Sequence, residues 1–253
     1  MHFLFYHILK RINIKLTQII INQMNSYKTA ARIVGALFLI STAGYIVGNL
    51  LIDSLRHDPN YLTIISKNET QMITGVILML VNCFAVVGIA IVMFPILKRH
   101  NENIALVYLS SRIIESIVLI FGVISYLSLL TISKQYIKLN ADDVSYFKAL
   151  GVVAMNGNYY SFQIGMISLS IGSSFFCYLL YQSKLVPRFF AVWGIIGYVA
   201  LFIGTITALY GYDISVITFV PVGLFEIILP IWLIFKGFNP RATVPISIKT
   251  DMA

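Results

Sequence analysis

The sequence predicts an all-α protein, a polytopic membrane bundle of six transmembrane helices with both termini in the cytoplasm. Three observations lead to this fold class: an apolar composition, six long apolar segments, and an uneven distribution of basic residues between them. Of the 253 residues, 58% are apolar and 11% are charged, against about 45–50% and about 25% in soluble domains. The mean hydropathy is +0.86. So little polar surface cannot cover a water-exposed globule, which excludes soluble enzymes, secreted disulfide scaffolds, and disordered or nucleic-acid-binding chains.

Each of the six apolar segments is long enough to cross a bilayer. A hydrocarbon core of about 30 Å requires about 20 apolar residues in a helix, and backbone polar groups in lipid must be satisfied within that helix. None of the segments alternates with a period of two, as the strands of a membrane barrel would. We therefore expect transmembrane helices over residues 33–52, 72–97, 104–132, 160–182, 189–211 and 214–235.

The basic residues predict the orientation of these spans, because Lys and Arg accumulate in cytoplasmic loops. One side of the membrane receives five of them: Arg56, Lys67, Lys134, Lys138 and Lys148. The other side receives twelve: Lys10, Arg11, Lys15, Lys28, Arg32, Lys98, Arg99, Lys184, Arg188, Lys236, Arg241 and Lys249. We assign the second side to the cytoplasm and the chain to the inner membrane. The net charge of +8 then reflects loop positions rather than nucleic-acid binding, and membrane lipids are the expected partners.

Composition divides the chain into three regions. Residues 24–238 form the six-helix domain, and residues 239–253 form a cytoplasmic tail. Residues 1–23 begin with an apolar stretch and continue with basic residues, which is the reverse of a secretory signal. Two interpretations stay open for this region: a basic helix that lies in the membrane interface, or translation that starts at Met24.

The loop over residues 133–159 carries a helical pattern of its own. Val144, Phe147 and Gly151 fall at helical spacing, and two acidic residues precede them. Acidic residues favour the first turn of a helix. We therefore expect a short surface helix in this loop, which serves either as an interfacial connector or as a lid.

Small residues and prolines within the spans predict how the helices pack. Gly44 and Gly48 form a GxxxG pattern, which lets helices approach closely in lipid. We expect this contact within the chain rather than between two copies, and the oligomeric state stays open. Pro95, Pro221 and Pro230 each remove a backbone donor and release a carbonyl one turn earlier. We expect helix kinks at these three prolines.

Three ionisable residues lie deep inside predicted spans: Arg112 and Glu115 in the third, and Glu226 in the sixth. Such a residue costs about 2.5–3.5 kcal/mol at the bilayer centre, so it usually has a partner or a function. Arg112 and Glu115 are three positions apart and share a helix face. Counted from the cytoplasmic helix ends, Glu115 lies about 16 Å deep and Glu226 about 15 Å. The two carboxylates should therefore be level in the membrane, with Arg112 within reach of either.

The function of these three residues has several interpretations. One arginine and two carboxylates leave a net charge of −1 unless one glutamate keeps a proton. The set is either a structural ion-pair cluster or a small-molecule or ion site in a proton- or ion-coupled carrier. Intramembrane catalysis is a third alternative, but the sequence has no HExxH, GxSxG, Walker or dinucleotide-binding motif. We expect no catalytic residues, no metal ligands and no cofactor. The leading hypothesis is an inner-membrane protein without enzymatic activity, built around Arg112, Glu115 and Glu226.

Four motifs, taken in order, resemble an uncharacterised bacterial six-helix membrane family, domain-of-unknown-function family 4386. They are Lys28-Thr-Ala-Ala-Arg32 before the first span, Arg112-Ile-Ile-Glu115 in the third, Ser183-Lys184-Leu-Val-Pro187-Arg188 before the fifth, and the stretch from Pro221 through Glu226 to Trp232 in the sixth. The resemblance covers about residues 24–238. It implies a membrane location and six helices, and it carries no known activity, substrate or cofactor.

Overall fold

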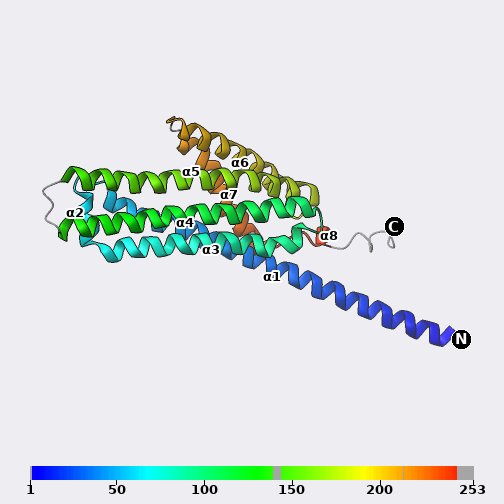
Figure 1. Cartoon of the computed structure of the whole chain (residues 1–253). Helices are drawn as coiled ribbons and strands as arrows, with labels where there is room; N and C mark the ends of the chain where they lie inside the picture. Colours follow the sequence, from blue (N-terminus) through cyan, green and yellow to red (C-terminus); the bar gives the residue numbers. More distant parts are fainter. Residues whose placement is uncertain (1, 139–143, 213, 244–253) are drawn as a thin grey trace.

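The computed structural model describes residues 2–138, 144–212 and 214–243 (Figure 1). Within these ranges the chain is helical, and no strand is present. The helices are α1 (His2–Arg56), α2 (Tyr61–Lys67), α3 (Glu69–Leu97), α4 (Glu102–Lys138), α5 (Val144–Ser183), α6 (Arg188–Leu209), α7 (Ser215–Lys236) and α8 (Pro240–Thr243). Six of them are long and apolar enough to cross a membrane: α1, α3, α4, α5, α6 and α7. The predicted all-α fold with six spans is confirmed, whereas the cytoplasmic location of the termini stays a prediction.

Charged residues and a glycine mark several helix ends. α3 and α4 begin with Glu69 and Glu102, whose carboxylates interact favourably with the positive end of the helix dipole. α7 ends at Lys236 and is followed by Gly237, which has a φ of 72°. Glycine adopts this left-handed conformation without steric penalty and so ends the helix. The span boundaries therefore follow local chemistry.

The six long helices form a closed ring. Each packs against the next long helix along the chain, and α7 returns to pack against α1. In Figure 1, α3, α4 and α5 lie side by side along the bundle, while α1 crosses behind them. The ring has a basic end, where Arg32, Lys98, Lys184 and Lys236 lie. Two contacts join elements there: Arg99 donates to the Tyr27 hydroxyl at 2.6 Å, and the Asn239 N–H donates to the Leu185 carbonyl at 2.8 Å.

Gly44 and Gly48 lie on the side of α1 that packs against α3. A Cβ at Gly44 would lie 2.9 Å from the carbonyl oxygen of Leu78, and one at Gly48 would lie 2.8 Å from that of Gly75. Both distances are shorter than van der Waals contact allows, so only glycine permits this helix spacing. The GxxxG pattern thus serves a contact within the chain.

The prediction of a separate surface helix in the 133–159 loop is wrong. α4 continues to Lys138 and α5 begins at Val144, so most of the segment extends the two membrane helices. Residues 139–143 lie outside the described part of the chain. The segment is helical, as its spacing predicts, and Gly151 and Gly157 do not interrupt α5. They give close contact instead: a Cβ at Gly151 would clash with the Tyr61 ring, and one at Gly157 would lie 2.7 Å from the Ser125 hydroxyl.

Two further features concern the ends of the first span. α2 was not predicted, because seven residues are too few for a periodic pattern; it packs against α4, and its Tyr61 hydroxyl donates to the Lys148 carbonyl at 3.1 Å. Burial raises the pKa of Tyr61 above its ordinary value.

Residues 2–23 form the first part of α1, which projects beyond the bundle in Figure 1. Both interpretations of this region stay predictions.

Candidate functional site

A cavity of about 230 Å³ lies inside the helix ring, and all six long helices contribute to its wall. Its polar lining consists of Ser41 and Thr42 from α1, Asn82 from α3, Arg112 and Glu115 from α4, and Glu226 from α7. The remaining lining is aromatic or aliphatic. The cavity is therefore amphipathic, and it contains every ionisable residue that the sequence placed deep inside a span.

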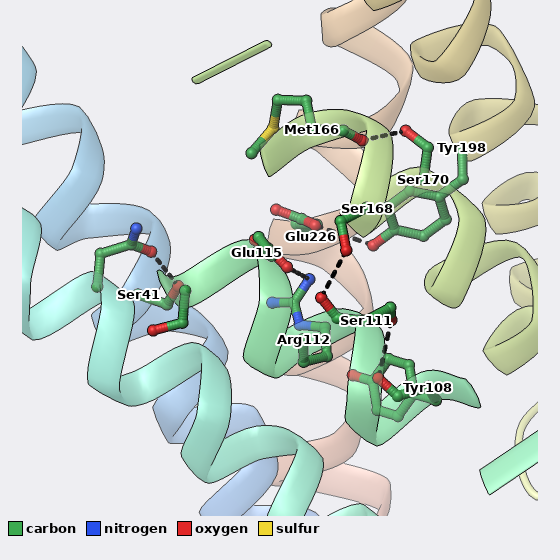
Figure 2. A network of polar contacts seen from close by, with 12 residues as sticks. Ser41, Tyr108, Ser111, Arg112, Glu115, Met166, Ser168, Ser170, Tyr198 and Glu226 are labelled. Carbon is green, nitrogen blue, oxygen red and sulfur yellow. Dashed lines mark hydrogen bonds and ion pairs between the residues drawn. The ribbon is translucent and has the colours of Figure 1, made fainter. Parts of the chain in front are cut away.

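The charged side of the cavity is built from α4, α6 and α7. Arg112 Nη1 lies 2.9 Å from Glu115 Oε2, and both side chains are only 3% exposed. Glu226 is partly exposed, and its Oε1 accepts a hydrogen bond of 2.9 Å from the Tyr198 hydroxyl. Figure 2 shows the side chains of Arg112, Glu115 and Glu226 directed toward one another. Within the described part of the chain, Arg112 Nε is one of three buried side-chain polar atoms without a hydrogen-bond partner, together with Glu115 Oε2 and Gln163 Oε1.

A second polar contact borders the cavity between α1 and α3. The Ser41 hydroxyl donates to Asn82 Oδ1 at 2.6 Å, and both side chains are buried. In lipid, such a bond between two helices contributes about 0.6 kcal/mol. Both residues also line the cavity, so this pair extends its polar surface beyond the ion pair.

The apolar part of the cavity includes a stack of three aromatic rings. Tyr45 of α1 stacks on Phe162 of α5 at 5.5 Å, and Phe162 stacks on Phe219 of α7 at 5.6 Å. All three residues line the cavity. Phe219 and Glu226 are separated by about 10 Å along α7, so the aromatic stack and the acidic groups lie at different depths. A ligand that touches both must have an apolar body and a charged end.

The sequence did not reveal Tyr198 or the aromatic stack. A tyrosine hydroxyl inside an otherwise apolar span is a signal, because a buried hydroxyl usually finds a partner. That signal could have identified Tyr198 but not its acceptor, Glu226. Tyr45 carried the same signal, but Phe162 and Phe219 did not, since exposed phenylalanines such as Phe84 and Phe121 occur in the spans as well.

The family model described as "Domain of unknown function (DUF4386)" matches residues 33–237. The chain belongs to the DUF4386 family. The predicted resemblance is confirmed, and the matched range of this DUF4386 chain contains every residue that lines the cavity. No curated protein and no solved structure gives a significant match.

In this DUF4386 protein the three predicted kink residues lie inside continuous helices. Pro95 is in α3, and Pro221 and Pro230 are in α7. The carbonyl of Pro221 accepts a hydrogen bond of 3.0 Å from the Trp193 indole. Pro230 removes the donor that would bond the carbonyl of Glu226. Glu226 therefore brings a side-chain carboxylate and a released backbone carbonyl to the same level of α7.

Among the described residues, no group of three or more His, Cys, Asp or Glu side chains is close enough to hold a metal ion. Cys83 of α3 and Cys177 of α5 are both buried and free. The groups that the cavity offers a ligand are one guanidinium, two carboxyl groups, hydroxyls and an amide, with aromatic and aliphatic walls.

Proposed function

We propose that this DUF4386 protein is a small carrier of the bacterial inner membrane that exchanges protons for an organic cation in its central cavity. One observation carries the proposal. Glu226 is half-buried and lines the cavity, beside an ion pair that already joins Arg112 and Glu115. A second carboxylate placed there has no arginine of its own within the cavity lining.

The charge balance of the cavity supports exchange. With both glutamates ionised, its lining carries a net charge of −1, because Arg112 is its only basic residue. An uncompensated charge in a low-dielectric setting is strongly unfavourable. Either a proton on Glu226 or a bound cation neutralises it. Since the two compete for the same carboxylate, binding of the cation releases the proton, which is the coupling that an exchanger requires.

The dimensions and lining of the cavity indicate the kind of cation. Its volume of about 230 Å³ is below the roughly 300–1,000 Å³ of pockets for drug-sized ligands. Most of the wall is apolar, including the stacked rings of Tyr45, Phe162 and Phe219. A compact ammonium ion with an apolar substituent matches both features. Its charge would lie at Glu226 and its substituent against the rings.

The first test measures binding by the purified protein in detergent. Phenyltrimethylammonium, a permanent cation with an apolar ring, should raise the melting temperature more at alkaline than at acidic pH, because protons compete for Glu226. Glu226→Gln should abolish this stabilisation. Glu102→Gln is the matched control, since Glu102 is exposed at the start of α4, and it should keep the effect.

The second test measures movement in proteoliposomes that contain a pH-sensitive dye. An inward gradient of phenyltrimethylammonium should make the interior alkaline with the native protein and not with Glu226→Gln. The probe has no titratable proton, so it cannot change the pH by itself. If neither binding nor a pH change occurs, the structural cluster is the better interpretation. Turnover of a lipid or peptide that is lost with Glu226→Gln would instead favour the enzyme.

A further inference from the structure

A second concave surface lies at the basic end of the bundle, separate from the central cavity. This groove of about 510 Å³ lies where α5 meets α6 and where α7 meets α8. Lys184, Arg188 and Lys236 line it, together with Trp232 and Asn239, and no acidic residue does. None of the three basic residues forms an ion pair with an acidic residue in the described part of the chain. Among the described residues, the groove therefore carries three positive charges and no acidic partner for them.

The two rims of the groove are fixed to each other. The Asn239 N–H donates to the Leu185 carbonyl at 2.8 Å, and the Asn239 side-chain amide donates to the Lys184 carbonyl at 3.2 Å. Lys184 has a φ of 57°, a left-handed conformation that non-glycine residues rarely adopt. Arg188 lies over the Tyr181 ring at 4.9 Å. These contacts fix the backbone next to Lys184 against the segment that follows Lys236, and they orient the Arg188 side chain.

The surroundings of the groove match the level of lipid headgroups. It sits at the ends of three membrane-length helices, and Trp232 belongs to a residue type that is enriched at the membrane interface. Phe189 and Phe235 stand next in sequence to Arg188 and Lys236, and they are 66% and 79% exposed. Apolar side chains this exposed suit contact with acyl chains. Charged groups and lipid-facing rings thus occur at the same end of the bundle.

We propose that this groove binds the phosphodiester headgroup of an anionic phospholipid. Basic pockets between membrane helices on the cytoplasmic side recognise such headgroups. Three positive charges complement a lipid with two phosphates better than a lipid with one. The predicted order of affinity is cardiolipin, then phosphatidylglycerol, then the zwitterionic phosphatidylethanolamine. The groove and the central cavity share no lining residue, so this proposal is independent of the carrier function.

The test is native mass spectrometry of the full-length protein with added cardiolipin, phosphatidylglycerol or phosphatidylethanolamine. The double variant Arg188→Gln, Lys236→Gln should weaken cardiolipin binding about 30-fold, since each basic residue near an anionic lipid contributes about fivefold. The matched control is Lys98→Gln, Arg99→Gln, which removes two exposed charges from the same end of the bundle but outside the groove. It should change binding less than about twofold. Charge-preserving Lys236→Arg should retain binding.

Three results would overturn the assignment. Equal weakening in the groove and control variants would mean that lipid is attracted only by net charge. Unchanged binding in the groove variant, with its melting temperature in detergent also unchanged, would mean that the lipid binds elsewhere. Displacement of cardiolipin by millimolar inorganic phosphate would identify a small free anion as the ligand.

Discussion

The Tyr198 hydroxyl donates a hydrogen bond of 2.9 Å to Glu226 Oε1 and so links α6 to α7 at the central cavity. The tyrosine side chain is 1% exposed, and its ring packs against Phe225 at 5.7 Å with an interplanar angle of 83°. Packing therefore fixes the aromatic ring of Tyr198, and the Tyr198 hydroxyl can hold the Glu226 carboxylate in place. Glu226 has two oxygens, so one can bond Tyr198 while the other stays available to the cavity.

Tyr198→Phe should separate this positioning role from packing. The ring is retained, so the stability loss should be small, about 0.6 kcal/mol, as for other hydrogen bonds between membrane helices. Binding of phenyltrimethylammonium should weaken several-fold, because the ionised carboxylate loses a donor. Melting curves with and without the cation measure both quantities. A large stability loss with unchanged affinity would contradict a positioning role.

Arg112→Leu should strongly destabilise the protein. The substitution leaves Glu115 buried without its counter-charge, and breaking such a pair typically costs about 3–5 kcal/mol. The triple variant Arg112→Leu, Glu115→Leu, Glu226→Leu should recover much of that loss, because an apolar replacement of a whole buried ionic group is often nearly neutral. Thermal denaturation in detergent measures all three proteins. A neutral Arg112→Leu would show that the three side chains do not depend on one another.

One carboxyl group of the cavity should be protonated at neutral pH. The lining carries two carboxyl groups against one guanidinium, and a proton removes the surplus negative charge. Infrared difference spectra should show a protonated carboxyl band that disappears in Glu226→Gln. The spectrum of Glu115→Gln, compared with that of Glu226→Gln, identifies which of the two glutamates carries the proton. Absence of the band in the native protein would leave no proton available for exchange.

The orientation of the bundle can be tested with reporter fusions. Fusions after Lys98 and after Pro240 should report a cytoplasmic location, and a fusion after Lys138 should report an external one, because basic residues favour the cytoplasmic side. α4 ends at Lys138, so this fusion point follows a complete helix. Deleting residues 1–23 should leave the pattern unchanged. A cytoplasmic signal at Lys138 would contradict the predicted orientation.

Two glycines should respond oppositely to alanine. A Cβ at Gly48 would lie 2.8 Å from the Gly75 carbonyl oxygen, whereas one at Gly223 would meet no atom within 4 Å. Gly48→Ala should therefore force α1 and α3 apart and lower stability by about 1–3 kcal/mol. Gly223→Ala should be neutral or stabilising by up to about 1 kcal/mol, because glycine is unfavourable within helices. Melting temperatures of the two variants decide the comparison.

The sequence predicted what depends on local composition. Length and hydropathy located the six spans, and the high cost of charge in lipid singled out Arg112, Glu115 and Glu226. The sequence did not predict the complete site, because the site also depends on how each helix is rotated about its own axis. Phe225 is fully buried and Phe235 is 79% exposed, although both belong to α7. Lipid tails are as apolar as a protein core, so hydropathy gives no sign of which face turns inward.

The same limit explains why the basic groove and the partner of Tyr198 were not predicted. Lys184 and Lys236 were counted as charges on one side of the membrane, and this count carries no information about their proximity. The two lysines line one groove, where the hydrogen bond between Asn239 and Leu185 joins positions far apart in the chain. Which helices pair depends on packing in three dimensions, whereas the length and hydropathy of each segment are enough to predict the span boundaries.

The closure of the ring by α7 against α1 has a consequence for assembly. Every other seam of the ring joins helices that follow each other among the six spans, so those seams can form as the chain is synthesised. The last seam joins segments from opposite ends of the sequence, and contacts between distant segments form late because loop closure opposes them. Until α7 docks, the ion pair of Arg112 and Glu115 borders an open bundle. Since α7 supplies Glu226 and three further lining residues, docking of this final helix completes the cavity wall and brings Glu226 beside that ion pair.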